Sequence, residues 1–446
     1  MRFAAKLLVR SRAYVIPSLL LIGVAAAQQT TSLPATPPLR LTLQDALARA
    51  RRNSVAYQSA LTDAGVARED KYQARAALLP SVTYNTSGIY TEGTGVDGGV
   101  KFIANNAVHE YFSQGNVHEA IDMAGFAEFR RNGAAAAAAR ARSEIASRGL
   151  VVTVVQTYYG VAAAQLKLEV AQKAADEGES FLKLTQQLER GGEVAHSDVI
   201  KAELQGNDRL RQLREAKLAF LNARLDFVVL IFPDLTDDFE IAEDLHANIS
   251  LPTLPQVQQL AARDNPDIRA ALETAREAGY GVTVSRAGYL PSLSFDYFYG
   301  IDATHFATRT DGISNLGSSI VASVNIPIWN WGATQSRVRQ AELRRDQAKR
   351  ELSLAQRKLL AELQSLYAEA EAAASELANL QRSTELAAES LRLTTLRYRD
   401  GEATVLEVVD AQNTASLASS AYQDGAVRYR VALANLQTLT GVLTTP

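Results

Sequence analysis

The segment LPSVTY at Leu79–Tyr84 returns as LPSLSF at Leu290–Phe295. Further along the chain, Gly192–Glu193 returns as Gly401–Glu402. Subtracting position 79 from 290 gives an offset of 211, and subtracting 192 from 401 gives 209, so the register is kept between the two pairs. A unit of this length is far too long for a solenoid repeat. The sequence therefore predicts a duplicated domain, in which each copy has a helix, strands, a long helix, a tight turn and a return helix.

The chain divides into four predicted segments. Residues 1–27 have the pattern of a secretory signal peptide, with a basic start, an apolar run and an AAA cleavage site before Gln28. The apolar run is shorter than the ~20 residues of a membrane-spanning helix, which argues against an anchor. A Pro-rich linker follows at 28–40. The two structural repeats are then 41–245 and 246–446.

Composition narrows the possible functions. The formal net charge is −3 and becomes −7 once the four cations of the signal peptide are removed, so nothing favours binding to nucleic acid. The chain has no cysteine, and an exported protein without disulfides depends on packing or assembly for its stability. No further apolar run is expected to form a spanning helix. Any membrane insertion is therefore expected to use β-strands.

Strands are predicted at about 81–91 and 108–123 in the first repeat, and at about 292–302 and 318–328 in the second. Apolar and polar residues alternate in each of them, most clearly in the second repeat. Strands of ten residues with aromatic side chains on one face suit a tilted path across a membrane. Alternation of this kind fits a soluble hairpin with one wet face equally well.

Helices account for most of the remaining sequence. One should begin at Leu41 with Thr42 as its N-cap and run to about Leu78, and its counterpart should begin at Thr253–Val257 and end before Pro291. Two proline-free stretches, about 126–190 and 333–399, predict helices of roughly 100 Å at 1.5 Å per residue. The second stretch has apolar or small residues with the 3.5-residue period of a coiled coil. Small seam residues suit a wide wall of several helices.

One chain cannot satisfy this architecture alone. Membrane barrels start at about eight strands, and each chain supplies four. A lone pair of such long helices also has nothing to cover its second face. Both shortfalls disappear if several chains each contribute four strands and their helices, so the sequence predicts an oligomer.

The chain resembles the TolC-like outer-membrane efflux proteins. The resemblance rests on the paired Leu-Pro-Ser segments, the strand-to-helix junction IPIWNWG at Ile326–Gly332, RYRDG at Arg397–Gly401, VVDAQ at Val408–Gln412, and the duplication. It implies a fold that is mainly α with a membrane β-barrel. The duplicated helix–strand–strand–long helix hairpin repeats of a homotrimer would form a 12-stranded β-barrel in the outer membrane. A long periplasmic α-helical barrel, closed at its far end, would lie below it.

The same resemblance implies the exit duct of a tripartite efflux pump or a type I secretion system. The partners would be a periplasmic membrane-fusion adaptor protein, an inner-membrane RND or ABC transporter reached through the adaptor, and outer-membrane lipid. The alternative is a structural or adhesive coiled-coil surface protein. That alternative explains the helices and the signal peptide, but it does not explain the amphipathic strands or the duplicated glycine turns.

The sequence offers no catalytic constellation, and neither an enzyme nor a cofactor is predicted. The pattern GxGxxG at Gly93–Gly98 matches a dinucleotide fingerprint, but it lacks the strand–helix unit that the fingerprint requires. The five histidines do not have metal-ligand spacing, and no metal site is predicted.

Glu407 and Asp410 are the candidate channel constriction. Three residues apart on a helix, they share a face, and spacing alone is equally typical of a solvated charged face. The matching positions of the first repeat are Asp198 and Lys201, a pair that can neutralise itself. The resemblance places the two acids at a narrow periplasmic entrance, where a trimer would gather six carboxylates.

The resemblance also assigns roles around the two turns. Asp198 and Tyr398 match positions whose hydrogen bonds hold the far end shut, and we call them the tip latch. Ala403 stands where family members can carry an arginine, so the latch is expected to be weaker or built differently. The turns would dock the adaptor through Gly191, Gly192, Glu193, Gly401 and Glu402.

Overall fold

The computed structural model describes residues 39–90, 109–234, 239–242, 245 and 250–440. The predicted signal peptide, residues 28–38 of the linker and the GxGxxG segment lie outside this part of the chain. The rest forms one unit from Arg40 onward.

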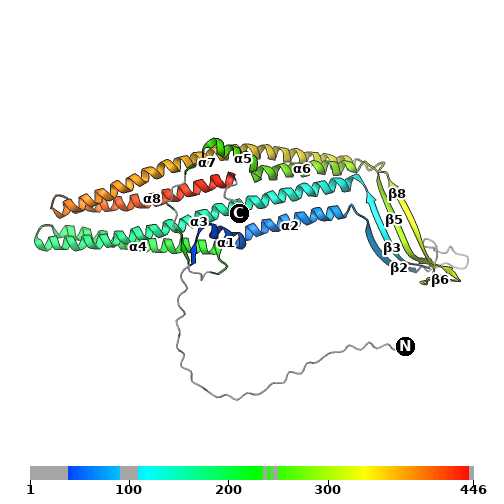
Figure 1. The fold of residues 1–446 in the computed structure, drawn as a ribbon, viewed down its shortest axis with the longest axis horizontal. Helices are drawn as coiled ribbons and strands as arrows, with labels where there is room; N and C mark the ends of the chain where they lie inside the picture. Colours follow the sequence, from blue (N-terminus) through cyan, green and yellow to red (C-terminus); the bar gives the residue numbers. More distant parts are fainter. Residues whose placement is uncertain (1–38, 91–108, 235–238, 243–244, 246–249, 441–446) are drawn as a thin grey trace, which may run out of the picture. The chain divides into compact units, whose positions relative to one another are not determined.

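The two halves contain the same series of elements (Figure 1). The first half has α1 (Leu43–Asn53), α2 (Val55–Ala76), β2 (Ser81–Tyr90), β3 (His109–Ile121), α3 (Met123–Gly191) and α4 (His196–Ile231). The second has α5 (Leu254–Asp264), α6 (Pro266–Ala287), β5 (Ser292–Ala303), β8 (Leu316–Asn325), α7 (Ala333–Arg399) and α8 (Val405–Thr440). The long helices have 69 and 67 residues, and both return helices have 36.

Two short pairs of strands complete the described structure. β1 (Leu39–Leu41) pairs with β4 (Phe239–Ile241), and β6 (Arg309–Thr310) pairs with β7 (Ile313–Ser314). The Tyr158 hydroxyl on α3 donates to the carbonyl of Leu41 at 3.2 Å and to that of Ala242 at 2.7 Å. Tyr158 also packs against Phe227 of α4 in the largest apolar core. This core fixes the start of the first half against the middle of the helices.

The helices before the strands are each broken once, which corrects the prediction of single helices. Thr42 and Asp45 do form the predicted capping box. The first helix then breaks at Ser54, whose hydroxyl accepts from the Tyr57 N–H and starts α2. The matching helix breaks at Asn265, immediately before Pro266, because proline cannot donate the next helical hydrogen bond.

Four strands form one antiparallel sheet in the order β2-β3-β5-β8. Val117 faces Tyr297, which in turn faces Ile320, so one surface of the sheet is apolar and aromatic. The other surface is polar, and His118 lies 2.8 Å from Asp296 on it. β8 ends at Asn325 rather than near 328, because Pro327 removes a strand donor.

The sheet has two unpaired edges. β2 and β8 are the outer strands, and nearly all their residues are exposed. Open edges of this length recruit further strands unless something covers them. No closed barrel exists within the part of one chain that the structure describes.

The helices keep the order of the strands. Next to the sheet, α2, α3, α6 and α7 lie side by side, and each is joined directly to β2, β3, β5 or β8 (Figure 1). Farther from the sheet, α4 contacts α3, and α8 contacts both α3 and α7. The two glycine turns therefore lie at the end of the helices that is remote from the sheet.

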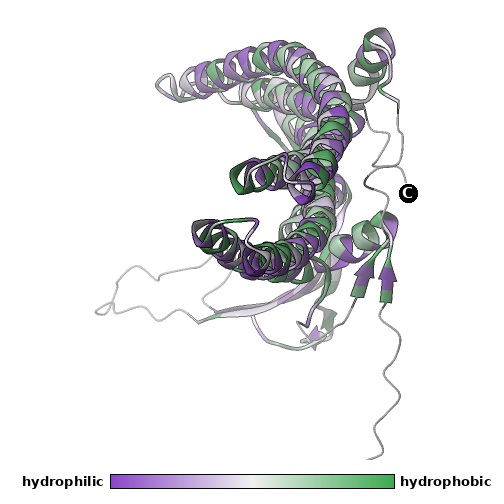
Figure 2. Ribbon diagram, turned by 90° about the vertical axis from the view of Figure 1, so that its left-hand side faces the viewer, coloured by the Kyte–Doolittle hydropathy of each residue, from purple (hydrophilic) through white to green (hydrophobic). Residues whose placement is uncertain are grey.

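Large apolar side chains remain exposed on the long helices. They include Leu218, Leu221 and Leu225 on α4 and Leu343, Leu354 and Leu360 on α7. In Figure 2, hydrophobic and hydrophilic residues alternate along each long helix. Exposed apolar stripes of this kind are typical of surfaces that bind another protein or a membrane.

One expectation about membrane spans is wrong. Among the described residues, α3 contains an 18-residue window with a mean hydropathy of 1.2, long and apolar enough to cross a membrane. Half of that window is buried inside the protein. The apolar content of α3 is therefore also explained by its packing against α2, α4, α6 and α8.

We predict that Gly300→Ala destabilises the sheet. A Cβ at position 300 would overlap the carbonyl oxygen of Ser113 and the Cα of Gln114, both in the backbone of β3. Overpacking of this kind costs roughly 1–3 kcal/mol. The measurement is the midpoint temperature of thermal unfolding of the detergent-solubilised protein. Gly317→Ala on β8 is the control, since nothing lies within 4 Å of its added Cβ. Equal stability of both variants would contradict the packing.

Candidate functional site

Both turns end a long helix in the same way. Gly192 has φ 78° and Gly401 has φ 76°, so both have the left-handed backbone that favours glycine. The N–H of Glu193 donates to the carbonyl of Leu188 at 2.9 Å, and that of Glu402 donates to Arg397 at 2.8 Å. These contacts satisfy helix-end carbonyls, so each glycine has a structural reason. Gly191 is the last residue of α3, and its φ is not positive.

The structure brings the two turns together through an apolar cluster, which we call the tip cluster. It contains Phe181, Ala202, Tyr398, Val405 and Val408. Tyr398 is only 3% exposed, and its ring centroid lies 5.2 Å from that of Phe181 on α3. Its hydroxyl donates to Oγ1 of Thr185 at 3.3 Å. Tyr398 thus joins α7 to α3.

The negative charge of Asp198 acts on Lys201 and on the Tyr398 hydroxyl. Its carboxylate lies 3.2 Å from Nζ of Lys201, as the self-neutralising pair was predicted to do. Burial raises the pKa of the Tyr398 hydroxyl, the hydrogen bond with Thr185 lowers it, and the Asp198 charge raises it further. The hydrogen bond of Tyr398 goes to Thr185, which sequence reasoning missed.

Glu407 caps the start of α8. Its Oε1 accepts from the backbone N–H of Thr404 at 3.2 Å and from the Thr404 hydroxyl at 3.1 Å, while its own N–H donates back to Oγ1 at 3.3 Å. The backbone and side-chain hydrogen bonds of Thr404, together with the positive charge of Arg397, hold the pKa of Glu407 below its ordinary value. The spacing Thr404-x-x-Glu407 is a capping-box signature that the sequence reasoning overlooked.

Asp410 lies one turn further along α8. It is exposed, and no ion pair to it occurs among the described residues. Its position on the same side of the helix as Glu407 follows from their spacing of three residues. The two acids are therefore adjacent, but only Glu407 has a structural role within the single chain.

An arginine near the second turn belongs to α7. Nη2 of Arg397 donates to the carbonyl of Glu402 at 3.0 Å, and Nη1 lies 3.6 Å from Oε2 of Glu407. Family members can carry an arginine at the position of Ala403. In this protein, Ala403 packs at the edge of the tip cluster. Arg397 therefore braces the turn within its own hairpin.

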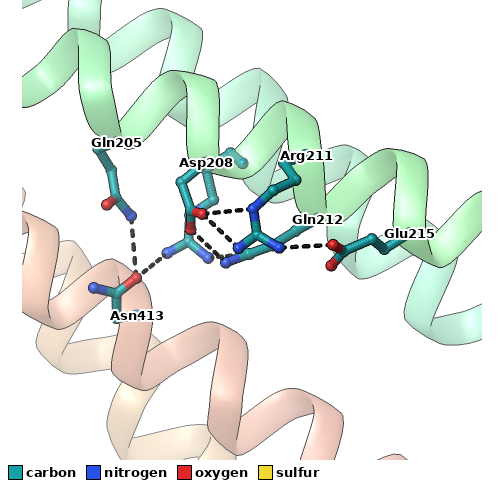
Figure 3. Close-up of polar contacts among 7 residues, drawn as sticks. Gln205, Asp208, Arg211, Gln212, Glu215 and Asn413 are labelled. Carbon is teal, nitrogen blue, oxygen red and sulfur yellow. Dashed lines mark hydrogen bonds and ion pairs between the residues drawn. The ribbon is translucent and has the colours of Figure 1, made fainter.

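A polar bridge lies farther along the helices (Figure 3). Arg209 on α4 is 2% exposed and donates to Oδ1 of Asn413 on α8 at 2.9 Å. The side-chain amide of Gln205 lies 3.1 Å from this oxygen. Two grooves, of 640 Å³ and 830 Å³, are both lined by Arg209. The bridge joins residues about 200 positions apart and has no sequence signature.

Across the part of the chain that the structure describes, no group of three or more His, Asp or Glu side chains could hold a metal ion. The site consists of two glycine turns, the tip cluster, two adjacent acids and a buried polar bridge. This arrangement can hold helices together and present charge.

Residues 257–442 match the family model "Outer membrane efflux protein". Over these residues, which are most of the second half, the chain is similar to outer membrane efflux proteins. It is 24% identical to the outer membrane efflux protein BepC of Brucella suis over 374 residues, which are 80% of this chain and 76% of BepC. It is 22% identical to the alkaline protease secretion protein AprF of Pseudomonas aeruginosa, over 80% of this chain and 75% of AprF.

Solved structures share the fold of this chain. The Campylobacter jejuni outer membrane channel CmeC superposes with a TM-score of 0.79 at 19% identity, covering 90% of this chain and 85% of CmeC. The outer-membrane channel OprN superposes with a TM-score of 0.78 at 20% identity, covering 90% and 89%. The predicted family is confirmed.

We predict that Glu407→Ala loosens the start of α8, whereas Glu407→Gln does not. Glutamine can accept the same capping hydrogen bonds, and alanine cannot. Hydrogen exchange at the Thr404 amide should become several-fold faster in the alanine variant only. Asp410→Ala serves as the control, because it removes a neighbouring charge without touching the cap. Equally slow exchange in all three variants would show that the capping box is not formed.

Proposed function

We propose that this protein is an outer-membrane channel that forms the exit duct of an efflux pump or a type I secretion system. Its family and its relatives named for efflux and protease secretion support this function. The observation that carries the proposal is the continuity of each strand with a helix, which leads from a membrane-type sheet to the remote glycine turns. The protein localises to the outer membrane and extends into the periplasm.

The two open sheet edges support a homotrimer. β2 and β8 run in opposite directions at the two edges, so β8 of one chain can pair antiparallel with β2 of the next. Three chains would close a 12-stranded barrel without a free edge, as a bilayer requires. The exposed leucines on α4 and α7 would be covered in the same assembly. We keep the predicted limits of the two structural repeats, 41–245 and 246–446, as part of this proposal.

The acids at the remote end support a role as the entrance. In a trimer, Glu407 and Asp410 would supply six carboxylates around one axis. Rings of acidic side chains select cations and bind multivalent ones. The contacts with Thr404 and Arg397, which lower the pKa of Glu407, favour its charged form. The tip latch of Asp198 and Tyr398 would hold this end closed, with Thr185 as the hydrogen-bond partner of Tyr398.

The partners in this proposal are those that the resemblance to outer-membrane efflux proteins implies. Six turns would face the periplasm and dock a membrane-fusion adaptor through Gly191, Gly192, Glu193, Gly401 and Glu402. An inner-membrane RND or ABC transporter would act through that adaptor. The apolar sheet surface would contact outer-membrane lipid. The alternative of an adhesive surface protein is not supported, because the relatives are named for efflux and secretion.

Trimer closure predicts a disulfide between chains. The chain has no native cysteine, so one cysteine at Val321 on β8 can be combined with one at Thr83, Asn85 or Ser87 on β2. One of these pairs should form linked dimers and trimers on denaturing gels, because a fixed strand register brings only one pair within bonding distance.

The matched control places the second cysteine at Asn116 on β3, a strand that is already paired on both sides. It should give no linkage between chains. A monodisperse monomer in detergent, with no linkage from any pair, would refute the trimer.

Block of the channel by multivalent cations tests whether Glu407 and Asp410 form the acidic entrance. The double variant Glu407→Gln with Asp410→Asn removes both charges and keeps the cap, so block by divalent or trivalent cations added at the periplasmic side should disappear in planar bilayers. Replacing both with alanine should also raise the open-channel conductance. The control is Asp400→Asn with Glu402→Gln, which removes two exposed acids from the adjacent turn. Block that persists without Glu407 and Asp410 would place the ring elsewhere.

Docking at the turns predicts that Gly401→Trp abolishes export from cells while trimers remain in the outer membrane. No atom lies within 4 Å of an added Cβ at this position, so bulk is accommodated in the free protein. Gly401→Ala is the control, since it carries the left-handed backbone strain without the bulk. If the tryptophan variant exports normally, docking at this turn is wrong. If both variants lose their trimers, the glycine has only a structural role.

A further inference from the structure

The bridge around Arg209 joins two helical hairpins that otherwise meet through α3. α8 packs mainly on α7 and α3 and touches α4 only over a short stretch. Nη2 of Arg209 donates to Oδ1 of Asn413 at 2.9 Å, and Nη1 donates to Oε1 of Gln212 on its own helix at 2.9 Å. Arg209 thus supplies a direct contact from α4 to α8.

The stem of Arg209 packs beside Gly178 on α3. A Cβ added at Gly178 would lie 3.4 Å from the Cγ of Arg209, which is ordinary van der Waals contact. The guanidinium reaches Asn413 from α4, which packs mainly on α3 and touches α8 only over a short stretch.

The guanidinium is buried among neutral partners. Burial lowers the pKa of Arg209, and the charges of Asp208 and Glu177 raise it. Asp208 is itself engaged with Arg211 and Gln212, and in the described part of the chain no carboxylate lies within ion-pair distance of Arg209. A buried charge held by amides is strongly destabilised when a partner leaves, because its desolvation is then uncompensated.

The surroundings of the bridge are thinly packed. The groove of 640 Å³ lies among α3, α4 and α8, and the groove of 830 Å³ lies mainly among α3, α7 and α8. Arg209 lines both grooves. Because α4 and α8 touch only over a short stretch, the hydrogen bonds of Arg209 carry much of the direct link between these two helices.

We propose that Arg209 is a positioning residue that holds the α3–α4 hairpin against the α7–α8 hairpin, and that its release from Asn413 accompanies widening of the end that carries Glu407 and Asp410. The bridge lies 11 residues beyond Asp198, roughly 16 Å along α4. The inference rests on the proposed channel function.

The test compares Arg209→Met with Arg211→Met in the full-length trimer. Arg211 carries the same charge two residues on, but it pairs only with Asp208 and Glu215 of its own helix. A spin label on a cysteine at Glu402 gives three equivalent labels, whose separation reports the width of the far end. Arg209→Met should widen this separation and raise the open-to-closed ratio in bilayers by roughly tenfold, the factor expected for one lost hydrogen bond to a charged group. Arg211→Met should change neither.

The second part of the test uses a variant that should favour the closed channel. Asn413→Asp gives Arg209 a carboxylate partner, so it should lower the open-to-closed ratio below that of the native protein. In the Arg209→Met background the same change should not close the channel. If Arg209→Met fails to assemble, Asn413→Asp in the native background still tests the proposal, because an unchanged open-to-closed ratio would overturn it.

The proposal is overturned if Arg209→Met behaves like Arg211→Met, or if Asn413→Asp closes the channel equally with and without Arg209. The spin-label separation does not depend on transport. If no variant conducts ions but the separation responds as stated, the channel function is wrong and the positioning role stands. If the channels conduct and the separation never changes, the positioning role alone is wrong.

Discussion

Unpaired backbone groups at the two edges of the sheet constrain everything else in this protein. β2 and β8 each present a row of N–H and C=O groups without partners in their own chain. In a bilayer such groups have no water to bind, and each would cost several kcal/mol. In the proposed channel, the apolar sheet surface around Val117, Tyr297 and Ile320 would contact lipid. A sheet with two unpaired edges can enter a bilayer only when strands of other chains complete the hydrogen bonding at β2 and β8.

The junctions between strands and helices follow from a difference in spacing. Neighbouring strands lie about 4.8 Å apart, whereas packed helices lie 8–10 Å apart. A chain that passes from one to the other must change direction at every junction. The sequence supplies a break at each one: Pro80 after α2, Asp122 before α3, Pro291 after α6, and Pro327 with Gly332 before α7. The helices therefore lie in the same order as the strands to which they are joined.

The sequence predicted the parts of this fold that local chemistry determines. The long helices, the four strands and the left-handed Gly192 and Gly401 needed only proline positions, alternation and turn chemistry. The breaks at Ser54 and Asn265 were missed because a good N-cap inside a helical pattern looks like an ordinary polar residue. The site was predicted less well, since Tyr398–Thr185 and Arg209–Asn413 join residues about 200 positions apart. Glu407 was singled out for its charge, while its cap at Thr404 went unnoticed.

The chemistry of the contacts divides the helical region into a fixed part and a part suited to movement. Around Tyr158, Phe227 and Ile231 the helices are joined by large buried apolar side chains, and separating them would expose that whole surface. Toward the glycine turns the apolar contact between the hairpins is the smaller tip cluster, and single polar groups such as the Tyr398 hydroxyl and the Arg209 guanidinium take part in the contact. Hydrogen bonds can be exchanged with water as the hairpins part, so their net cost is modest. A gate requires two states separated by only a few kcal/mol, and this end of the helices meets that requirement better than the large apolar core does.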